Sequence, residues 1–303
     1  MTDEHARTRT GLLLGVGAYL SWGLIPLYFR AIAAVPASEI VAHRIIWSLL
    51  FLGLLIAALK RWGAARAALA NRTALLILAA TALLIGVNWL VFTYAVTSGH
   101  VLAASLGYYL NPLVNILLGV ALLKERLSRA QGIATALAAA GVAVLAVGSG
   151  AGPALWISLA LAASFALYGF LRKIAPAGAL EGLTVETAML APVAIGWIAI
   201  LHANGTAGFA AHGGLVAFLV ALGGAITAIP LLLFTGAARR LPYSTLGFLQ
   251  YIAPTLQFLI GVFYGERLTV PHMICFAAIW TALALVAADG WRTARRARVA
   301  QPL

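Results

Sequence analysis

Four ionisable side chains lie inside apolar segments and are the first candidates for chemistry in this sequence. Glu39, His43 and Arg44 stand close together near the start of one such segment, and Glu186 stands near the start of a later one. Glu39 and His43 are four residues apart, so that on a helix they can pair on one face. Imidazole and buried carboxyl groups are the side chains with which proteins take up and release protons near neutral pH. His43 and Glu186 are therefore candidate proton carriers.

The sequence alone allows several roles for Arg44. A charge within an apolar segment is costly and is a functional candidate by default. His43 and Arg44 could instead hold their helix against its neighbours, or bind a carboxylate on a ligand. Arg44 could also extend to the membrane surface, with Glu39 as its counterion. For Glu186, the alternative to a functional role is that of an acid at the membrane interface.

A second group of candidates combines aromatic rings with hydrogen-bonding groups. Tyr108, Asn111 and Asn115 follow the spacing i, i+3 and i+7, which places them on one helical face. We expect this face to line a cavity, although membrane amides can also simply tie helices together. Such a mixture suits a ligand with an apolar body and a few polar atoms. The candidate substrate-binding residues are Trp22, His43, Arg44, Asn88, Trp89, Tyr108, Asn111, Asn115, Tyr168, Gln250 and Tyr251.

Signatures of catalysis are absent from the sequence. The six histidines are scattered, and no nucleophile elbow, P-loop or dinucleotide fingerprint occurs. We therefore expect no catalytic residue, no metal site and no cofactor. An intramembrane hydrolase that uses Ser and His stays open as an alternative.

The composition indicates which elements must position these candidates. The chain is 63% hydrophobic and 9% charged, with a mean hydropathy of +1.00, whereas soluble domains are roughly 25% charged. A helix needs about 20 mostly apolar residues to cross a bilayer. The sequence therefore predicts an all-α integral membrane protein with ten transmembrane helices. They are expected at 11–29, 38–59, 74–96, 101–123, 130–148, 154–170, 183–201, 213–235, 243–264 and 270–289.

The basic residues predict the orientation of these helices. If the N-terminus is cytoplasmic, all but three of the 20 Lys and Arg residues fall in the cytoplasmic segments. The exceptions are Arg30 and Arg267 on the outer side and Arg44 within a helix. Positive charge concentrates in cytoplasmic loops. Both termini are therefore expected in the cytoplasm.

An internal repeat relates two parts of the chain. The stretch 105–127 reappears in degenerate form at 245–268, and Pro112 and Pro254 are equivalent positions in the two copies. Each copy ends on an acid followed by Arg and Leu, with Glu125 in the first and Glu266 in the second. Their repetition favours a structural or gating role for these two acids over ligand binding.

The repeat predicts two halves, 1–150 and 151–303, with five transmembrane helices each. Because five is odd, the second half would cross the membrane in the opposite sense, as in the inverted repeats of many secondary transporters. Pro112 and Pro254 fall within helices, where each removes a backbone hydrogen bond and can introduce a kink. These two prolines are the expected gating positions.

Motifs that carry a family resemblance extend over nearly the whole chain. They are Trp22-Gly23 with Pro26 and Tyr28, Glu39 with His43-Arg44 and Trp47-Ser48, Asn88-Trp89, Ser105-Leu-Gly-Tyr-Tyr-Leu-Asn-Pro112, Tyr168-Gly169 with Arg172-Lys173, Glu186-Thr187, and Gly247-Phe-Leu-Gln-Tyr-Ile-Ala-Pro254. Together they resemble the EamA branch of the drug/metabolite transporter superfamily, and within it the RarD proteins.

This resemblance implies a permease of the cytoplasmic (inner) membrane that exports small organic molecules. Relatives elsewhere in the superfamily export amino acids, and their cavity is lined by the first, third, fourth, sixth, eighth and ninth helices. By the same resemblance, Asn88, Trp89, Tyr108 and Asn111 are expected to line a cavity here.

The sequence thus predicts a secondary transporter that works by alternating access, with proton-linked export as the leading hypothesis. The alternatives are a facilitative uniporter or exchanger of amino-acid-like solutes and, in another class, an intramembrane enzyme or an accessory membrane subunit. The expected partners are a small-molecule substrate and the lipid bilayer, with a homodimer as an alternative to a monomer and no nucleic acid. The identity of the substrate is left open.

Overall fold

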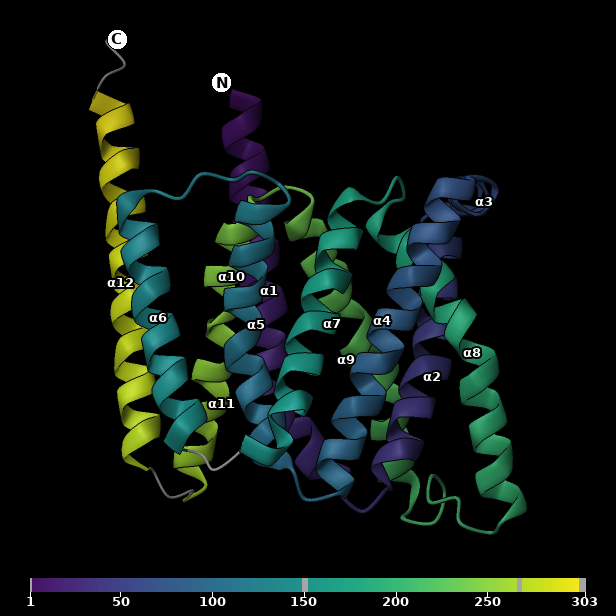
Figure 1. Ribbon diagram of the computed structural model, residues 1–303. Helices are drawn as coiled ribbons and strands as arrows, with labels where there is room; N and C mark the ends of the chain where they lie inside the picture. The colour runs from purple at the N-terminus through teal and green to yellow at the C-terminus, as the bar shows by residue number, and fades with distance from the viewer. Residues whose placement is uncertain (1, 149–151, 266–268, 300–303) are drawn as a thin grey trace.

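The computed structural model describes residues 2–148, 152–265 and 269–299. Glu266, the second acid of the repeat, lies outside these ranges. The regular elements of the described residues are all helical (Figure 1). They are α1 (Thr2–Ala31), α2 (Ala37–Ala58), α3 (Trp62–Ala70), α4 (Arg72–Thr97), α5 (Val101–Ala121), α6 (Arg129–Gly148), a 3₁₀ turn η1 (Gly152–Ala154), α7 (Leu155–Ile174), α8 (Ala179–Ala203), α9 (Gly214–Ala238), α10 (Tyr243–Gln250), α11 (Ile252–Phe263) and α12 (Val270–Val299).

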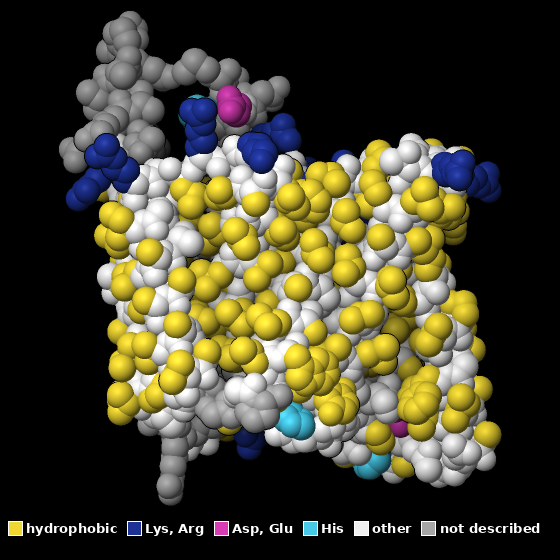
Figure 2. All heavy atoms as spheres, in the orientation of Figure 1, with side chains coloured by type: hydrophobic (Ala, Val, Ile, Leu, Met, Phe, Trp, Pro, Cys, Tyr) yellow, Lys and Arg dark blue, Asp and Glu magenta, His cyan; other side chains and the backbone are white. Residues whose placement is uncertain are grey.

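The prediction of ten membrane-spanning helices is confirmed for the described residues, where α10 and α11 together make one span. The outer surface of these helices is rich in apolar side chains (Figure 2). Leu54 is 63% exposed, Leu83 67% and Phe263 85%. Apolar side chains cover a surface in this way when lipid rather than water surrounds it.

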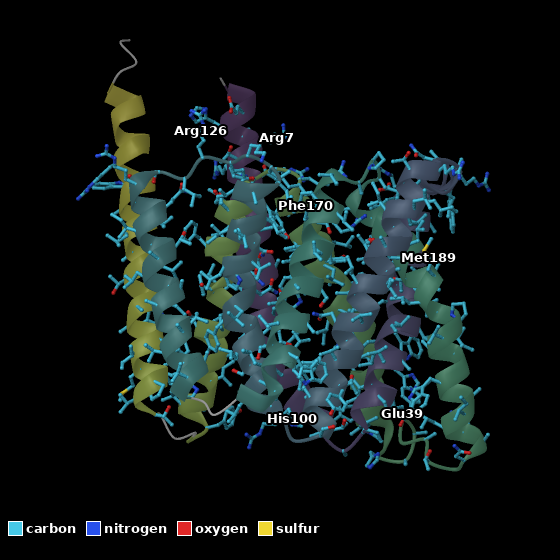
Figure 3. The ribbon with its side chains drawn as sticks, in the orientation of Figure 1. Arg7, Glu39, His100, Arg126, Phe170 and Met189 are labelled. Carbon is cyan, nitrogen blue, oxygen red and sulfur yellow. The ribbon has the colours of Figure 1, made fainter. Side chains whose placement is uncertain are left out.

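One end of the molecule carries both chain ends and most of the visible Lys and Arg side chains (Figures 1 and 2). We call it the basic end. Arg7 and Arg126 lie there, whereas Glu39 and His100 lie at the opposite end (Figure 3). The short helix α3, which the sequence did not predict, joins α2 to α4 at the basic end.

The helix packing is compatible with two related halves. Helix α6 packs on α12 and α2 packs on α8, and each of these pairs joins equivalent helices of the two halves. The contact of α1 with α9 has its counterpart in that of α4 with α7, and the contact of α5 with α7 has its counterpart in that of α1 with α11. The inverted repeat and the division into 1–150 and 151–303 stay predictions that this packing supports.

Close approach of α2 and α9 fixes the direction of the polar face of α2. A side chain at Gly224 of α9 would collide with the backbone at Trp47 and Ser48. Ser48 Oγ donates a hydrogen bond to the Gly224 carbonyl at 2.9 Å, and both helices are buried there. Small residues permit such packing within membranes. The contact turns Arg44, one helical turn before Ser48, toward the interior of the bundle.

The two repeated prolines have different surroundings. Helix α5 continues without interruption through Pro112. The equivalent span is divided at Tyr251, three residues before Pro254, into α10 and α11. The Tyr251 amide donates to the Phe248 carbonyl at 3.3 Å, a bond with a spacing of three residues in place of the four of an α-helix. The helix is therefore interrupted near one of the two repeated prolines and continuous at the other.

Candidate functional site

A cavity of about 120 Å³ lies between helices of both halves. Its walls come from α1, α2, α4, α5, α7, α10 and α11. The lining residues are Tyr19, Trp22, Ile25, Phe29, Arg44, Asn88, Trp89, Phe92, Gly107, Tyr108, Asn111, Leu161, Phe165, Gln250, Ala253, Pro254 and Gln257. The family resemblance led us to expect a contribution from the eighth span, α9. The second span, α2, contributes Arg44 instead, while α9 lies behind it.

The cavity occupies the half of the bundle that is remote from the basic end. Helix α4 runs away from the basic end, and its lining residues begin at Asn88, in its second half. Helices α5 and α7 run toward the basic end, and their lining residues end at Asn111 and Phe165, at about the middle of each helix. The cavity therefore extends from about the middle of the bundle toward the end remote from the basic end, and we call it the recess.

Arg44 places a positive charge in this cavity. Its Nε donates a hydrogen bond to Thr227 Oγ1 on α9 at 2.7 Å. Its guanidinium carbon lies 5.5 Å from the ring centroid of Phe29 and 5.5 Å from that of Trp89, within the range of cation–π attraction. Among the described residues, no carboxylate comes within 4.0 Å of it. The interpretation in which Glu39 is its counterion is wrong.

Glu39 is instead a structural acid at the end remote from the basic end. Its carboxylate is fully buried and accepts hydrogen bonds from the backbone N–H groups of Gly208, at 2.8 Å, and Phe209, at 3.0 Å. His43 Nε2 lies 3.7 Å from Glu39 Oε1, which confirms the pairing expected from their spacing. The His43 ring stacks on Phe209 with a centroid separation of 4.3 Å. This cluster ties the loop between α8 and α9 to α2 and does not line the cavity.

The amides near the middle of the bundle divide into two roles. Asn115 Nδ2 donates to Gln250 Oε1 at 2.5 Å and joins α5 to α10 from a fully buried position. Asn88 Nδ2 donates to the Leu161 carbonyl at 3.0 Å and to Ser164 Oγ at 2.9 Å, so its donors bind α7. Asn111, by contrast, lines the cavity, and its buried Oδ1 has no hydrogen-bond partner among the described residues.

An aromatic wall faces these polar groups. The Trp22 ring lies 5.4 Å from that of Phe165 and 5.6 Å from that of Tyr19, centroid to centroid. Trp22 was predicted, whereas Tyr19, Phe92 and Phe165 were missed. Tyr19, Trp22 and Phe29 repeat at helical spacing along α1, a signal that could have identified this wall. Phe165 has no comparable signal, because its position depends on how α7 packs.

The structure separates the predicted substrate-binding residues into two sets. Seven line the cavity, namely Trp22, Arg44, Asn88, Trp89, Tyr108, Asn111 and Gln250. The other four lie behind it in packed surroundings, namely His43, Asn115, Tyr168 and Tyr251. Of the two gating prolines, Pro254 lines the cavity and Pro112 is buried behind it.

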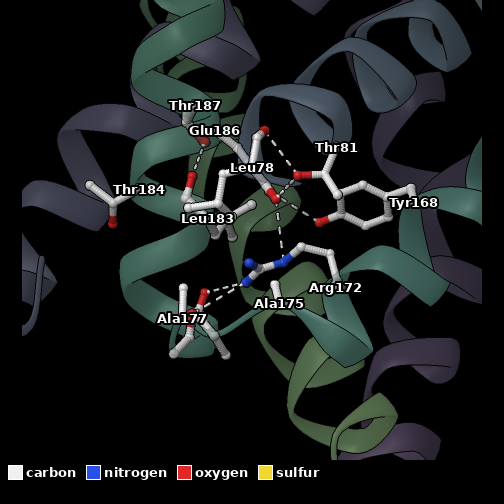
Figure 4. A network of polar contacts seen from close by, with 12 residues as sticks. Leu78, Thr81, Tyr168, Arg172, Ala175, Ala177, Leu183, Thr184, Glu186 and Thr187 are labelled. Atoms are coloured by element: carbon white, nitrogen blue, oxygen red, sulfur yellow. Dashed lines mark hydrogen bonds and ion pairs between the residues drawn. The ribbon is translucent and has the colours of Figure 1, made fainter. Parts of the chain in front are cut away.

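A buried polar network lies between the recess and the basic end (Figure 4). Arg172 Nε on α7 lies 3.4 Å from Glu186 Oε1 on α8, and the side chains are 0% and 1% exposed. The Thr81 hydroxyl donates to the same carboxylate, and the Tyr168 hydroxyl donates to Glu186 Oε2 at 3.4 Å. Arg172 Nη2 also donates to the Ala179 carbonyl at 3.0 Å. Glu186 is therefore not an acid at the membrane interface, and the network joins α4, α7 and α8.

A second, partly buried contact joins the segment after α5 to the start of α10. Glu125, in the segment that follows α5, accepts hydrogen bonds from the backbone N–H groups of Tyr243, at 2.5 Å, and Ser244, at 2.8 Å. These amides open α10, where a carboxylate satisfies free donors and the helix dipole. The acid thus has structural partners, in keeping with the role that its repetition suggested.

The fold and this recess define a multi-pass helical membrane protein with an internal cavity of aromatic rings and a few polar groups. The model of the EamA-like transporter family matches residues 9–147. The protein RarD of Streptomyces exfoliatus is 48% identical over 96% of this chain and 92% of its own length. An uncharacterized transporter of Pseudomonas aeruginosa is 46% identical over 96% of this chain and 97% of its own length. A crystal structure with 20% identity has a TM-score of 0.67 and covers 92% of this chain and 97% of that one, a likeness of fold alone.

The chain belongs to the EamA-like transporters of the drug/metabolite superfamily, in the group of the RarD proteins. The resemblance read from its motifs is confirmed, and with it the assignment to membrane transport.

Proposed function

We propose that the protein is a secondary-active exporter of small organic molecules that works by alternating access. The observation that carries this proposal is the position of the recess, which lies between the middle of the bundle and the end remote from the basic end, with buried and partly buried polar contacts on its other side. Tyr108 at the recess is 38% exposed, whereas Arg172 and Tyr168 beyond it are fully buried. A carrier needs a central site that opens to one side at a time.

The proposed orientation places the basic end in the cytoplasm of the cell and the protein in its inner membrane. The concentration of Lys and Arg at that end supports this orientation. The recess then opens outward, and the Arg172–Glu186 network is the inner gate that separates the site from the cytoplasm.

Proton coupling is the proposed energy source, with Glu186 or His43 as the carrier. Protonation of Glu186 would remove the charge that holds Arg172, and so weaken a contact between α7 and α8 that closes the inner side. His43 would act on the opposite side, through Glu39 and the loop between α8 and α9. In either case a proton would weaken a buried contact between neighbouring elements and so favour one conformation over the other, which is what coupling requires.

Counterflow in proteoliposomes tests the transport proposal. Vesicles that contain the purified protein are loaded with one unlabelled solute from a panel of amino acids and aromatic acids. For at least one member of the panel, the labelled solute should enter these vesicles faster than vesicles without the protein. Ala253→Phe, which fills the cavity wall, should abolish the exchange, whereas Gly53→Ala, at a site with no neighbour within 4 Å, should leave it unchanged.

Different outcomes identify the alternatives. Exchange that a pH gradient never alters would favour a facilitative uniporter or exchanger. Chemical alteration of a solute in place of its exchange would favour an enzyme. Absence of exchange across the whole panel would contradict the proposal.

A further inference from the structure

The charges around the cavity are unequally distributed. Among the described lining residues, Arg44 alone carries a full charge, and the remaining polar side chains are amides, phenols and indoles. The nearby acids have other partners. Glu39 binds two backbone amides and His43, and Glu186 binds Arg172. The cavity wall therefore has a net charge of about one positive unit, with no acid to balance it.

Arg44 has donors to spare for a ligand. Among the described residues, its one hydrogen bond goes from Nε to a neutral hydroxyl, that of Thr227. The flat guanidinium lies near the rings of Phe29 and Trp89, which position it without neutralising it. Guanidinium groups bind a carboxylate through two parallel N–H donors. A single guanidinium matches the charge of one carboxylate.

The rest of the wall describes the body of the ligand. Trp22, Trp89, Phe92 and Phe165 supply flat apolar surface, which suits an aromatic or compact apolar group. At the middle of the bundle, the free Asn111 Oδ1 can accept one hydrogen bond from a neutral donor. A primary ammonium would need an anionic partner among these largely apolar side chains, and none of the described lining residues offers one.

We infer that this cavity selects an organic monoanion, a carboxylate on an aromatic or apolar body, over a zwitterionic amino acid. Arg44 binds the carboxylate, and the aromatic wall binds the body. The inference rests on the proposed transport function and specifies its substrate class.

A charge series on one molecular body tests the inference. Labelled phenylacetate is the probe, and it is displaced from the purified protein by 2-phenylacetamide, phenylalanine and phenethylamine. These competitors keep the ring and are neutral, zwitterionic and cationic. We expect phenylacetate to bind at least about tenfold more tightly than each competitor, the contribution of a charge-assisted hydrogen bond.

Substitutions at Arg44 assign that preference to its charge. Arg44→Gln should abolish the advantage of phenylacetate over 2-phenylacetamide, and Arg44→Lys should retain part of it. Arg30→Gln is the matched control, because Arg30 lies outside the cavity lining, exposed and 4.1 Å from the Tyr264 ring centroid. If Arg44→Gln does not fold, Arg44→Lys and Thr227→Val, which removes the hydroxyl bound to Nε, still test the claim.

Binding and exchange give separable results. Equal or tighter binding of phenylalanine or the amide, or no binding of phenylacetate at millimolar concentration, would overturn the inference. Counterflow of a zwitterion would leave the transport proposal standing while refuting the monoanion site. Arg44-dependent binding of phenylacetate without counterflow would refute transport and leave the site intact.

Discussion

The two arginines within the bundle, Arg44 and Arg172, have opposite surroundings. Arg172 is fully buried and lies 3.4 Å from Glu186, with backbone carbonyls as further acceptors. Arg44 lies in the cavity, bound to a hydroxyl and flanked by rings, without a carboxylate among the described residues within 4.0 Å. One positive charge is neutralised by the chain itself and the other is not. The difference indicates that Arg172 serves closure and Arg44 serves recognition.

Burial explains why the two roles require different partners. A buried ion pair contributes little net stability, but removal of one partner leaves an isolated charge in a low-dielectric site. Arg44 avoids part of this cost because the cavity leaves it partly exposed. Arg44 loses its remaining contact with solvent only when a ligand enters the cavity. The charge of the ligand then compensates for that loss.

The largest effect should follow the removal of Arg172. Arg172→Met leaves Glu186 buried and without its cation, and the free energy of unfolding should fall by about 3–5 kcal/mol. Thermal unfolding in detergent measures this loss. The double variant Arg172→Met/Glu186→Met should recover most of it. If the double variant is as unstable as the single one, the ion pair does not explain the closure.

The next largest effect should be on proton coupling. Glu186→Gln keeps the shape of the side chain but cannot change charge, so export should no longer respond to a pH gradient while counterflow continues. His43→Gln is the parallel test on the opposite side of the bundle. Proton movement and labelled-solute flux in the same liposomes measure both. Full gradient-driven flux in both variants would exclude these two residues as carriers.

A smaller effect is expected at the span that is divided at Tyr251. Pro254→Ala restores a backbone donor near the break at Tyr251 and should stiffen the span, which would lower turnover more than phenylacetate affinity. Pro112→Ala, within the continuous α5, should change turnover less. Counterflow rates compared with binding constants separate the two cases. An equal loss of folded protein and of transport in both variants would indicate a structural role alone.

The smallest effect should come from Thr227. Thr227→Val keeps the volume near Arg44 and removes the hydrogen bond to its Nε. A neutral hydrogen bond contributes about 0.5–1.5 kcal/mol, so phenylacetate affinity should fall about two- to tenfold. Thr235→Val, a buried threonine further along the same helix and absent from the cavity lining, is the matched control. An unchanged affinity would show that the aromatic rings alone position Arg44.

The sequence predicted the features that depend on local pattern. The ten spans follow from long apolar runs, and the pairing of Glu39 with His43 follows from their separation by one helical turn. The polar face of α5 correctly predicted that Tyr108 and Asn111 line the cavity, whereas Asn115, one turn further along that face, contacts Gln250 behind it.

Features that depend on distant contacts were not predictable in the same way. The partner of Arg44 is Thr227, and the partners of Glu39 are the amides of Gly208 and Phe209. No spacing rule connects α2 to α9 or to the loop before it. The exclusion of Tyr168 and Tyr251 from the cavity likewise depends on how α7 and α10 rotate within the bundle. The asymmetry between Pro112 and Pro254 could not be read from two equivalent motifs.

The hydrogen bonds that α2 makes with distant residues can form only late in the synthesis of the chain. Glu39, Arg44 and Ser48 find their partners 169, 183 and 176 residues further along the chain. A ribosome synthesises a protein from its N-terminus, at about 5–20 residues per second. These polar groups of α2 therefore enter the membrane many seconds before α9 has been made. Until then α2 has only water, lipid headgroups or the insertion machinery to satisfy them. Biogenesis is thus most vulnerable while only the N-terminal half has been made. At that stage, quality-control proteases would recognise the incomplete chain.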